Sequence, residues 1–565
     1  MTSTEPDIVA MRARYPRTVD HFSRLADGLT ALRHVASLDT RWAALIRGET
    51  SPAQAHRGDL PATDADFDVV VAGGSLGLLT ALALARRGWR VMVFDQRVAG
   101  SAHREWNISQ EELQALVDDG LFTWAELRAV IMRHYRTGLV HFHGGHVPTQ
   151  EVWIDNVLDV AVDASALLRL ARHKLESLGA LILDQREFRQ AWLADNGPAR
   201  SVVEVAGSHG SLERYGARLL VNGMGATSPL SLALTPTLFS GVCPTVGTVA
   251  RGFATEGARG VDLALGEILV TIEHADAGGT RQLVWEAFPG RDDELTVYLF
   301  YYDLIDPARP QSLLGLYEVY FERLAEYKAP GPRFEYLRPV YGFIPSRHGA
   351  CHAPRARGVL TIGDAAAYQS PLTFCGFGSH VRHLGRVVDL ADYALRHGVL
   401  EADDLAQVSA HQANVSMMWA FARFMQPWRG GTEVNDLMNR FLGILMGLGP
   451  EGVRRFFQDR TTWRDYTRVL LQFAITTPAV FGWAREVIGF GGYLAWMRDY
   501  AAYSRRTAAM QVLHWLGRPG QAVALWVADG VSPAWGLRLR ARVGEWRACA
   551  PLSARGPACA PPPEA

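Results

Sequence analysis

The sequence of 565 residues predicts an α/β fold with a parallel sheet, a separate antiparallel sheet and a helical C-terminal region. Two glycine-rich turns, near residues 73 and 376, lie close to short apolar runs of the kind that buried parallel strands need. Between about 240 and 345, β-branched and aromatic runs alternate with turns, which is typical of antiparallel strands. The residues from 401 to 548 favour helices.

The first glycine-rich segment has the order strand, turn, helix, strand. Its turn contains the first residues that we expect to bind a dinucleotide: Gly73, Gly74, Ser75 and Gly77. Glycines let the backbone approach a pyrophosphate, and the following helix points its free N–H groups at it. Asp95 lies 22 residues after Gly73, near the expected position of a ribose-binding carboxylate. Ala72 replaces the first glycine of G-x-G-x-x-G, so an ordinary α/β turn is the alternative for this segment alone.

A second segment, almost three hundred residues later, supplies the other half of the site. Gly363 and Asp364 close another short apolar strand, where a carboxylate can hold a ribityl hydroxyl. A helix then begins at Gly376, Phe377 and Gly378, and its N-terminus can face a flavin or its pyrophosphate. A chain that binds only NAD would not need this second segment. Together the two predict a Rossmann-like FAD/NAD(P)-binding fold with FAD as cofactor.

A third glycine turn follows the strand that begins near Arg218. It has the sequence Asn222-Gly-Met-Gly225 and is either a further contact with the nucleotide or a plain β-turn.

The composition excludes several classes of function. The formal net charge of −1 gives no overall attraction to nucleic acid, so we expect no nucleic-acid partner. Five scattered cysteines without a C-x-x-C pair argue against a disulfide framework or a zinc site. Three histidines between 141 and 146 have no Cys or acidic ligand nearby in the sequence, and we expect no metal. With no signal peptide and no apolar run of membrane-spanning length, we expect a cytoplasmic protein.

Changes in composition divide the chain into six expected segments. They are an N-terminal helical extension (1–65), the first part of the FAD-binding domain (66–235), an antiparallel substrate-binding sheet (236–345), the second part of the FAD-binding domain (346–400), a helical membrane-associating region (401–548) and a disordered tail (549–565). Within the second segment, Ser109 and Glu112 have the spacing of a capping box that starts a helix.

More specific than the glycine turns are five stretches that occur in order along the chain. They are Arg104-Glu-Trp-Asn-Ile-Ser109, Glu111-Glu-Leu113, Trp153-Ile-Asp-Asn-Val-Leu-Asp159, Trp285-Glu-Ala-Phe-Pro289, and Gly363-Asp364 with Gln369-Ser-Pro-Leu372 and Gly376-Phe-Gly378. Over roughly residues 20 to 480 the chain thereby resembles the bacterial CruA/CruP type of FAD-dependent lycopene cyclase. The wider superfamily includes plant-type lycopene cyclases and geranylgeranyl reductases.

This resemblance implies carotenoid chemistry on an apolar substrate. The family reaction is a proton-initiated cyclisation of lycopene ends to β-ionone rings, which needs FAD in its reduced form and implies NAD(P)H as reductant. The resemblance also implies that Pro371 contacts the cofactor. Arg104 and Trp106 would pack on the FAD adenine or pyrophosphate, although Trp106 could instead be a core anchor.

Two other functions stay open at this point. One is an FAD-dependent prenyl or carotenoid reductase or monooxygenase. The other is a flavoprotein paralog that does not cyclise lycopene.

The reaction needs an acid in a dry, apolar site, because burial raises a carboxyl pKa and keeps the proton in place. Plant-type cyclases carry paired glutamates on a substrate-domain strand, but the corresponding stretch, Val297 to Asp303, has none. The nearest carboxyls are Glu286 and Asp303. We favour Glu286, which lies among apolar and aromatic residues; the alternative is a strand-face glutamate paired with an arginine.

Aromatic residues on these strands are candidates for contact with the polyene: Trp285, Phe288, Tyr298 and Phe300. Alternating aromatics also occur in plain sheet cores, which is the alternative.

Nine of the 16 tryptophans fall after residue 410, interleaved with arginines. Trp and Arg on amphipathic helices are typical of a protein that lies in a membrane interface. We therefore expect peripheral association with the inner membrane, which would suit a membrane-dissolved substrate. The alternatives are a helical subdomain packed on the core or a dimer face, and the oligomeric state stays open.

Overall fold

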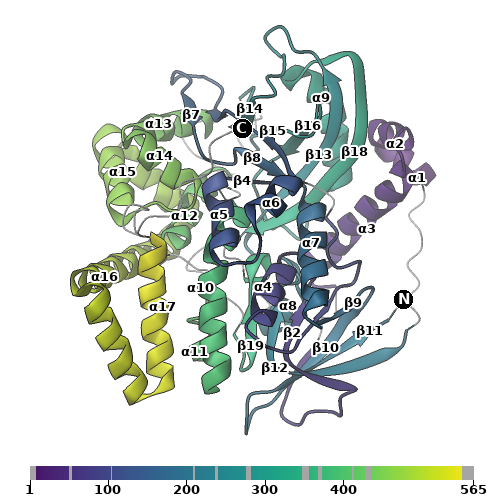
Figure 1. Ribbon diagram of the computed structural model, residues 1–565. Coiled ribbons are helices and arrows are strands. Elements are labelled where there is room, and N and C mark those ends of the chain that lie inside the picture. Colours follow the sequence, from purple (N-terminus) through teal and green to yellow (C-terminus); the bar gives the residue numbers. More distant parts are fainter. Residues whose placement is uncertain are drawn as a thin grey trace.

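The computed structural model describes residues 8–49, 54–102, 105–207, 210–235, 239–274, 281–346, 355–366, 372–373, 375–409, 413–426 and 434–549. Figure 1 shows two sheets with helices around them and a group of C-terminal helices to one side. Arg104, Pro371 and the expected tail from residue 550 onward lie outside the described residues.

The first sheet has eight strands in the order β1-β10-β11-β12-β2-β3-β9, with β19 also paired to β12. Their bounds are β1 Gln54–Arg57, β2 Ala65–Ala72, β3 Val91–Phe94, β9 Leu181–Leu183, β10 Glu187–Leu193, β11 Ser201–Ala206, β12 Leu212–Asn222 and β19 Val359–Thr361. Four adjacent strands, β3, β2, β12 and β19, are parallel, and their last residues lie side by side. Ala72 pairs with Phe94 and with Asn222, and Asn222 pairs with Thr361. The loops that follow β3, β2, β12 and β19 therefore meet at one edge.

Helices cover one face of this parallel part because alternate strand residues point to it. Val69 and Val71 of β2 pack there against α4 (Leu76–Ala85), α7 (Ala164–Ser177) and α10 (Gly376–His397). The opposite face packs against apolar residues of β10 and β11, with α8 (Pro229–Leu234) beside them. Helix α4 is apolar on all sides and buried from Gly77 to Leu84, as expected for a helix enclosed by neighbours.

The second sheet has the order β17-β13-β16-β15-β14-β6-β7, with β18 also paired to β13. The bounds are β6 Thr137–His141, β7 Glu151–Ile154, β13 Gly241–Phe253, β14 Leu265–Val270, β15 Val284–Pro289, β16 Leu295–Phe300, β17 Asp303–Leu304 and β18 Pro330–Ser346. All pairs are antiparallel except β14 with β6. The strands between 241 and 346 thus form the antiparallel sheet, and β6 and β7 extend it.

The two faces of the second sheet have different neighbours. One face packs against α9 (Leu313–Tyr327) and the N-terminal helices α1 (Ile8–Arg14), α2 (Pro16–Ser23) and α3 (Gly28–Ile46). The other face belongs to a hydrophobic cluster that extends into the C-terminal helices. The candidate site described below lies on this second face.

A small three-stranded sheet contributes to the same region. It contains β4 (Trp106–Ile108), β5 (Ile131–His134) and β8 (Val160–Val162). Helices α5 (Gln110–Asp118) and α6 (Trp124–Val130) lie between β4 and β5 in the chain. The capping box of Ser109 and Glu112 at the start of α5 is confirmed.

The C-terminal region is helical, as the sequence predicts. Its helices are α11 Ala402–Leu405, α12 Ala413–Phe424, α13 Val434–Met446, α14 Gly449–Phe457, α15 Trp463–Thr476, α16 Ala479–Val531 and α17 Pro533–Cys549. Helix α16 breaks at Gly489 and Gly517, where φ is 67° and 58°. Across the described residues, no helix combines the length and apolar composition that crossing a bilayer requires.

Candidate functional site

The glycine turn after β2 lies against the turn after β12. Gly73 has φ of +107°, and a Cβ on it would lie 2.4 Å from the carbonyl oxygen of Gly223. A Cβ on Gly77 would lie 2.9 Å from Cγ1 of Val71. The first glycine therefore permits contact between two loops, and the last permits α4 to pack closely on β2.

Asp95, at the end of β3, holds the same turn. Its Oδ2 accepts a hydrogen bond from the backbone N–H of Gly74 at 2.7 Å, and its Oδ1 accepts one from Arg97 at 2.7 Å. Each carboxylate oxygen has a further lone pair, so Asp95 can also accept from ribose hydroxyls.

The turn after β12 is tied to the segment that follows β19. Asn222 Oδ1 accepts from Ser228 Oγ at 2.8 Å, and Asn222 Nδ2 donates to Ser231 Oγ at 2.8 Å. Ser231 Oγ in turn donates to the carbonyl of Ala365, in the 3₁₀ turn Gly363–Ala366, at 2.9 Å. The glycine turns of residues 73, 223 and 363 are thus gathered at one sheet edge, and Asp364 lies there half-buried.

Two helices begin at this edge without a side-chain cap. Neither Ser75 before α4 nor Cys375 before α10 caps the backbone N–H groups of its helix with its side chain, whereas α5, α6, α7 and α9 each begin with a capping Ser, Thr or Asp. Uncapped N–H groups at the positive end of a helix are available to a phosphate or another anion. The edge therefore suits a dinucleotide.

The first turn of α10 brings the two sequence motifs together. The ring of Phe377 lies 4.4 Å from the ring of Trp106. His380 forms a hydrogen bond with the backbone of Leu76 at the start of α4, and burial lowers its pKa to about 4, so it is neutral. Trp106, Phe377 and the glycine turn therefore lie around one region, as a shared cofactor requires.

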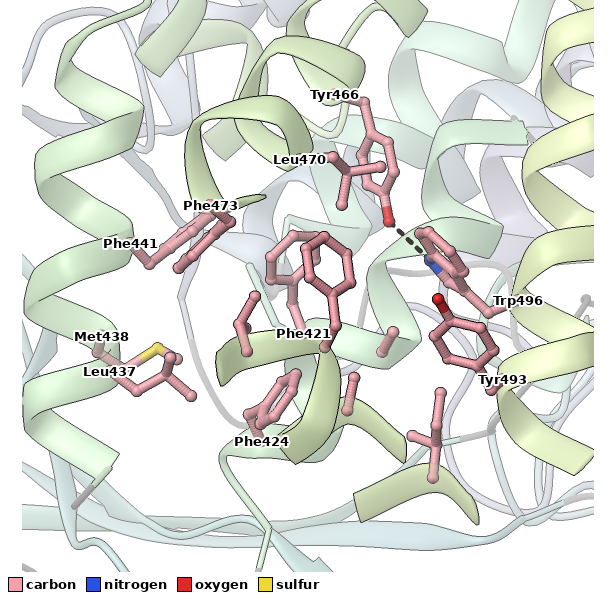
Figure 2. A pocket seen from close by; sticks show the side chains of 15 residues that line it. Phe421, Phe424, Leu437, Met438, Phe441, Tyr466, Leu470, Phe473, Tyr493 and Trp496 are labelled. Carbon is pink, nitrogen blue, oxygen red and sulfur yellow. Dashed lines mark hydrogen bonds between the residues drawn. The ribbon is translucent and has the colours of Figure 1, made fainter. Parts of the chain in front are cut away.

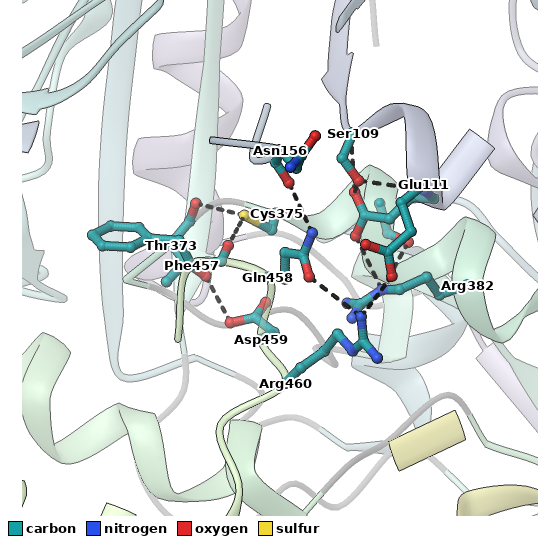
Figure 3. Close-up of polar contacts among 12 residues, drawn as sticks. Ser109, Glu111, Asn156, Thr373, Cys375, Arg382, Phe457, Gln458, Asp459 and Arg460 are labelled. Atoms are coloured by element: carbon teal, nitrogen blue, oxygen red, sulfur yellow. Dashed lines mark hydrogen bonds and ion pairs between the residues drawn. The ribbon is translucent and has the colours of Figure 1, made fainter. Parts of the chain in front are cut away.

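Partly buried ion pairs connect α5 with α10 and with the segment that follows α14 (Gly449–Phe457) (Figure 3). Arg382 Nε lies 3.0 Å from Glu112 Oε1, and Arg460 Nη1 donates to Glu111 Oε1 at 3.0 Å. A Cβ on Gly378 would lie 2.5 Å from Glu112 Oε2, so this glycine permits the approach of α5. Burial raises the pKa of Cys375 well above its usual value, which keeps that thiol protonated and unreactive.

We expect Gly73→Ala to lower the FAD content of the purified protein about tenfold or more. The added methyl would push the two glycine loops apart, and about 1.4 kcal/mol is a factor of ten in a binding constant. Gly88→Ala is the matched control, since Gly88 has φ of +89° but no atom within 4 Å of its missing Cβ. Flavin absorbance per protein measures both variants, and equal FAD content would contradict the prediction.

Glu286 lies on the face of the second sheet that belongs to the large hydrophobic cluster. Its side chain is 9% exposed, and no ion pair involves it within the described ranges. Burial raises its pKa to about 8, and the backbone N–H of Leu269 donates the hydrogen bond that partly opposes this rise. Glu286 is therefore mainly protonated at neutral pH, unlike a surface glutamate paired with an arginine.

An irregularity in β14 supplies that N–H. The register between β14 and β15 shifts between Glu267 and Val270, and Leu269 has φ of +54°, in the left-handed region that bulky residues avoid. Such strain often accompanies functional sites. Here the strained conformation places the neutral N–H of Leu269 as a hydrogen-bond donor to Glu286, without a positively charged group beside the carboxyl.

The aromatic candidates divide between the two faces of the sheet. Phe288, Tyr298 and Phe300 belong to the same cluster as the Glu286 face. Trp285 lies on the opposite face, where its ring packs 5.1 Å from Tyr327 of α9. Consecutive strand residues point to opposite faces, so Trp285 does not line a site with Glu286.

Asp303 has the surroundings of a structural carboxylate. Its Oδ2 accepts from Arg281 Nη2 at 2.7 Å and from Gln311 Nε2 at 3.0 Å. The backbone N–H of Leu304 donates to its Oδ1 at 2.9 Å. These three donors tie Asp303 to Arg281, Gln311 and the backbone at the end of the sheet, which is a structural role.

A second buried carboxyl, Glu105, is not among the residues predicted from the sequence, although it lies inside the Arg104–Ser109 stretch. It is 4% exposed, and Tyr298 Oη donates to its Oε1 at 3.0 Å. Arg338 Nη2 lies 3.8 Å from its Oε2. Tyr298 pairs directly with Glu286 across β15 and β16, so the tyrosine stands between the two carboxyls.

Of the histidines between 141 and 146, His143 and His146 contact helix α13, and His141 lies 3.6 Å from Glu151 of β7. His146 Nδ1 lies 3.0 Å from Asp436 Oδ2, and the ring of His143 packs 4.8 Å from that of His274. Within the described residues, no group of His, Cys, Asp and Glu side chains is arranged to hold a metal ion.

Of three comparisons with known proteins, the one with solved structures found similar proteins. No family model matches the chain, and no curated protein matches its sequence. Among solved structures, p-nitrophenol 4-monooxygenase PnpA from Pseudomonas putida DLL-E4 is similar with a TM-score of 0.50 and 16% identity, over 72% of this chain and 99% of that one. The halogenase PltM in complex with phloroglucinol and FAD has a TM-score of 0.49 and 15% identity, over 85% and 98%. The likeness to the monooxygenase structure confirms the predicted α/β fold.

Proposed function

We propose that this protein is an FAD-dependent lycopene cyclase that closes the ends of lycopene into β-ionone rings. The glycine turns, Asp95, Asp364 and the uncapped starts of α4 and α10 would hold FAD at the edge of the parallel sheet. Bound in its reduced, anionic form, FAD would supply negative charge that stabilises a nearby carbocation. We further propose NAD(P)H as the source of the electrons.

The observation that carries this proposal is Glu286. A carboxyl with a pKa near 8, in an apolar and aromatic setting, keeps its proton at neutral pH. An alkene has no polar group that an enzyme can bind or activate. Its protonation therefore needs an acid that is desolvated and held close to the double bond. Hydroxylation by a flavoprotein has no comparable need for a neutral buried carboxyl.

The chemistry balances without net oxidation. Glu286 donates its proton to the terminal double bond, the resulting cation closes onto the chain, and the new ring loses a proton. Tyr298 and Phe300, on the same face, offer aromatic surfaces to the cation. Glu105, bonded to Tyr298, is a second carboxylate on this face that can receive the departing proton.

Expression of the chain in a lycopene-accumulating bacterial host tests the proposal. Pigment analysis is expected to show monocyclic or bicyclic carotene and no change in oxidation level. Hydroxylated or saturated pigment, with NAD(P)H consumed in proportion to product, would instead support the monooxygenase or reductase alternatives. Unchanged lycopene, with FAD bound and reductant supplied, would overturn the cyclase proposal.

We also propose that the C-terminal helices contact a membrane surface. Trp515, Trp526 and Trp535 are 76%, 77% and 61% exposed on α16 and α17, which project from the body in Figure 1. Exposed Arg518 and Arg538 lie among them. Exposed tryptophan with neighbouring arginine suits the headgroup region of a bilayer, and an apolar substrate gives such contact a purpose.

Replacing Trp515 and Trp526 together with serine is expected to weaken binding to vesicles of phosphatidylcholine and phosphatidylglycerol by about tenfold or more. Each buried aromatic contributes about 1.5–3 kcal/mol, and about 1.4 kcal/mol is tenfold. Vesicle flotation measures the change. Trp153→Ser is the matched control, because Trp153 is 55% exposed on β7, away from these helices; equal losses in both proteins would count against the surface.

A further inference from the structure

The C-terminal helices enclose a pocket that neither the sequence nor the proposed chemistry assigns. Helices α12, α13, α15 and α16 surround about 630 Å³ of space outside the atoms, counting open solvent at its mouth. Figure 2 shows Phe421, Phe441, Phe473 and Trp496 among the side chains that line it.

The lining has no charged residue and almost no available polar atom. All residues that line the pocket are aliphatic or aromatic. The indole N–H of Trp496 donates to the hydroxyl of Tyr466 at 3.0 Å, and the hydroxyl of Tyr493 is the other polar group among the lining side chains. A ligand with polar groups would leave them unpaired here, which costs free energy, whereas a hydrocarbon would not. The pocket therefore selects a hydrocarbon chain.

The break in α16 shapes one wall. Gly489 has φ of 67° and ψ of 173°, so the helix changes direction between Ile488 and Tyr493, both of which line the pocket. A glycine is needed for this conformation, because a Cβ would be strained there. The helix thus contributes lining residues from both sides of the break.

Helix α13 connects the pocket with the region of Glu286. Asn435 Oδ1 accepts from Thr271 Oγ1 at 2.9 Å, and Thr271 lies two residues after Leu269. Asn439 Nδ2 donates to the carbonyl of His143 at 3.0 Å. Other residues of the same helix line the pocket: Leu437, Met438 and Phe441. The wall of the pocket is therefore attached to the end of β14, the strand whose Leu269 N–H bonds to Glu286.

Buried apolar side chains also connect the pocket with the Glu286 face. Phe288 and Tyr298 of the second sheet belong to the same buried cluster as Phe424, Phe441 and Tyr466 of the pocket. Outside the pocket, large apolar side chains are exposed next to its lining residues on α15 and α16: Leu471, Ile475, Phe490, Leu494 and Met497. Packed apolar side chains therefore connect the pocket with the Glu286 face, and exposed apolar side chains border it on α15 and α16.

We propose that this pocket binds the hydrocarbon chain of a long isoprenoid, holding the part of the substrate that is not at Glu286. The inference rests on the proposed function for the substrate class. It assigns the C-terminal helices a binding role in addition to membrane contact. The exposed rim is where such a chain leaves a lipid phase.

The test fills the pocket and measures retention of lycopene rather than turnover. Full-length protein carrying Glu286→Gln, which is expected to bind without cyclising, is purified from lycopene-accumulating cells, and pigment per FAD is measured after gel filtration. Adding Ala484→Trp, on the pocket lining of α16, is expected to lower retained lycopene about tenfold. Adding Ala501→Trp, at an exposed position of the same helix, is expected to leave it unchanged.

A second substitution that fills the pocket tests whether a loss of lycopene comes from a folding defect. Ala420→Trp fills the pocket from α12 and is expected to act like Ala484→Trp, with FAD content and thermal midpoint kept as in the Ala501→Trp protein. Equal retention with and without the plugs would overturn the inference and leave the cyclase proposal standing. No retained lycopene in the unplugged protein would also overturn it. Lycopene retained and displaced by the plugs, without ring formation by the native chain, would overturn the cyclase proposal alone.

Discussion

Glu286→Gln is expected to lower the rate of lycopene cyclisation by about 100-fold to 10,000-fold, the range typical of a lost general acid. Glutamine keeps the size of the side chain but cannot release a proton to an alkene. FAD content should not change, since Glu286 lies on the second sheet and not at the dinucleotide edge. Quantifying cyclic carotene from lycopene with reduced FAD gives the rate, and the native rate should fall as the pH rises through about 8, the pKa of this carboxyl.

Two further variants sharpen the assignment. Glu335→Gln is the matched control, because Glu335 is a strand glutamate that pairs with Arg251 Nη2 at 2.6 Å on the surface of β18. It should change the rate less than about twofold, since exposed ion pairs contribute about 1 kcal/mol or less. Asp303→Asn separates the two candidate acids. A rate that collapses in Asp303→Asn but survives in Glu286→Gln would show that the acid is Asp303.

The dinucleotide edge could be predicted from local sequence because its geometry follows from general rules. The carboxyl ends of adjacent parallel strands share an edge, so turns after β2, β12 and β19 meet wherever those strands are neighbours. What sequence left open was the turn at Gly223, which could have been an ordinary β-turn. Only the pairing of Asn222 with Ala72 brings it against Gly73, and strand pairing over 150 residues has no local signal.

The acid site was predictable in part. Glu286 follows from its apolar neighbours, and the period-two rule already separates it from Trp285, because adjacent strand residues face opposite ways. The N–H of Leu269 had no signal, since bulges with positive φ are usually marked by glycine and this one contains leucine. Glu105 could not be predicted for another reason: its hydrogen-bond partner, Tyr298, lies 193 residues away along the chain.

The pocket in the C-terminal helices shows a different limit. The sequence predicts membrane contact for the helical region 401–548, which includes α15 and α16, because amphipathic helices with tryptophan and arginine suit an interface. In the structure Phe473 and Trp496 from these stretches face inward, while Leu471 and Phe490 are exposed. Helical periodicity shows that such a helix has an apolar side but not which neighbour covers it.

Glu286 also makes stability depend on pH in a direction opposite to that of most carboxyls. Its pKa is about 8 in the folded protein against 4.5 for the unfolded chain, so the folded state holds the proton more tightly. Below about pH 4.5 both states are protonated and the group has no effect. Between about 4.5 and 8 the unfolded state loses its proton first, so the free energy of unfolding falls as the pH rises. The full slope is about 1.4 kcal/mol per pH unit, and the total is up to about 5 kcal/mol.

The glutamine variant lacks this titration, so its free energy of unfolding should rise relative to the native protein as the pH rises from about 5 to 8. The difference should level off above about pH 8, once Glu286 is ionised in both states. Urea unfolding of both FAD-loaded proteins at a series of pH values measures the difference, and the many other titrating groups cancel because they are common to both. A constant difference across this range would mean that Glu286 is ionised in the folded protein at neutral pH. It would then be a poor acid, and the proton donor for lycopene would have to be another group.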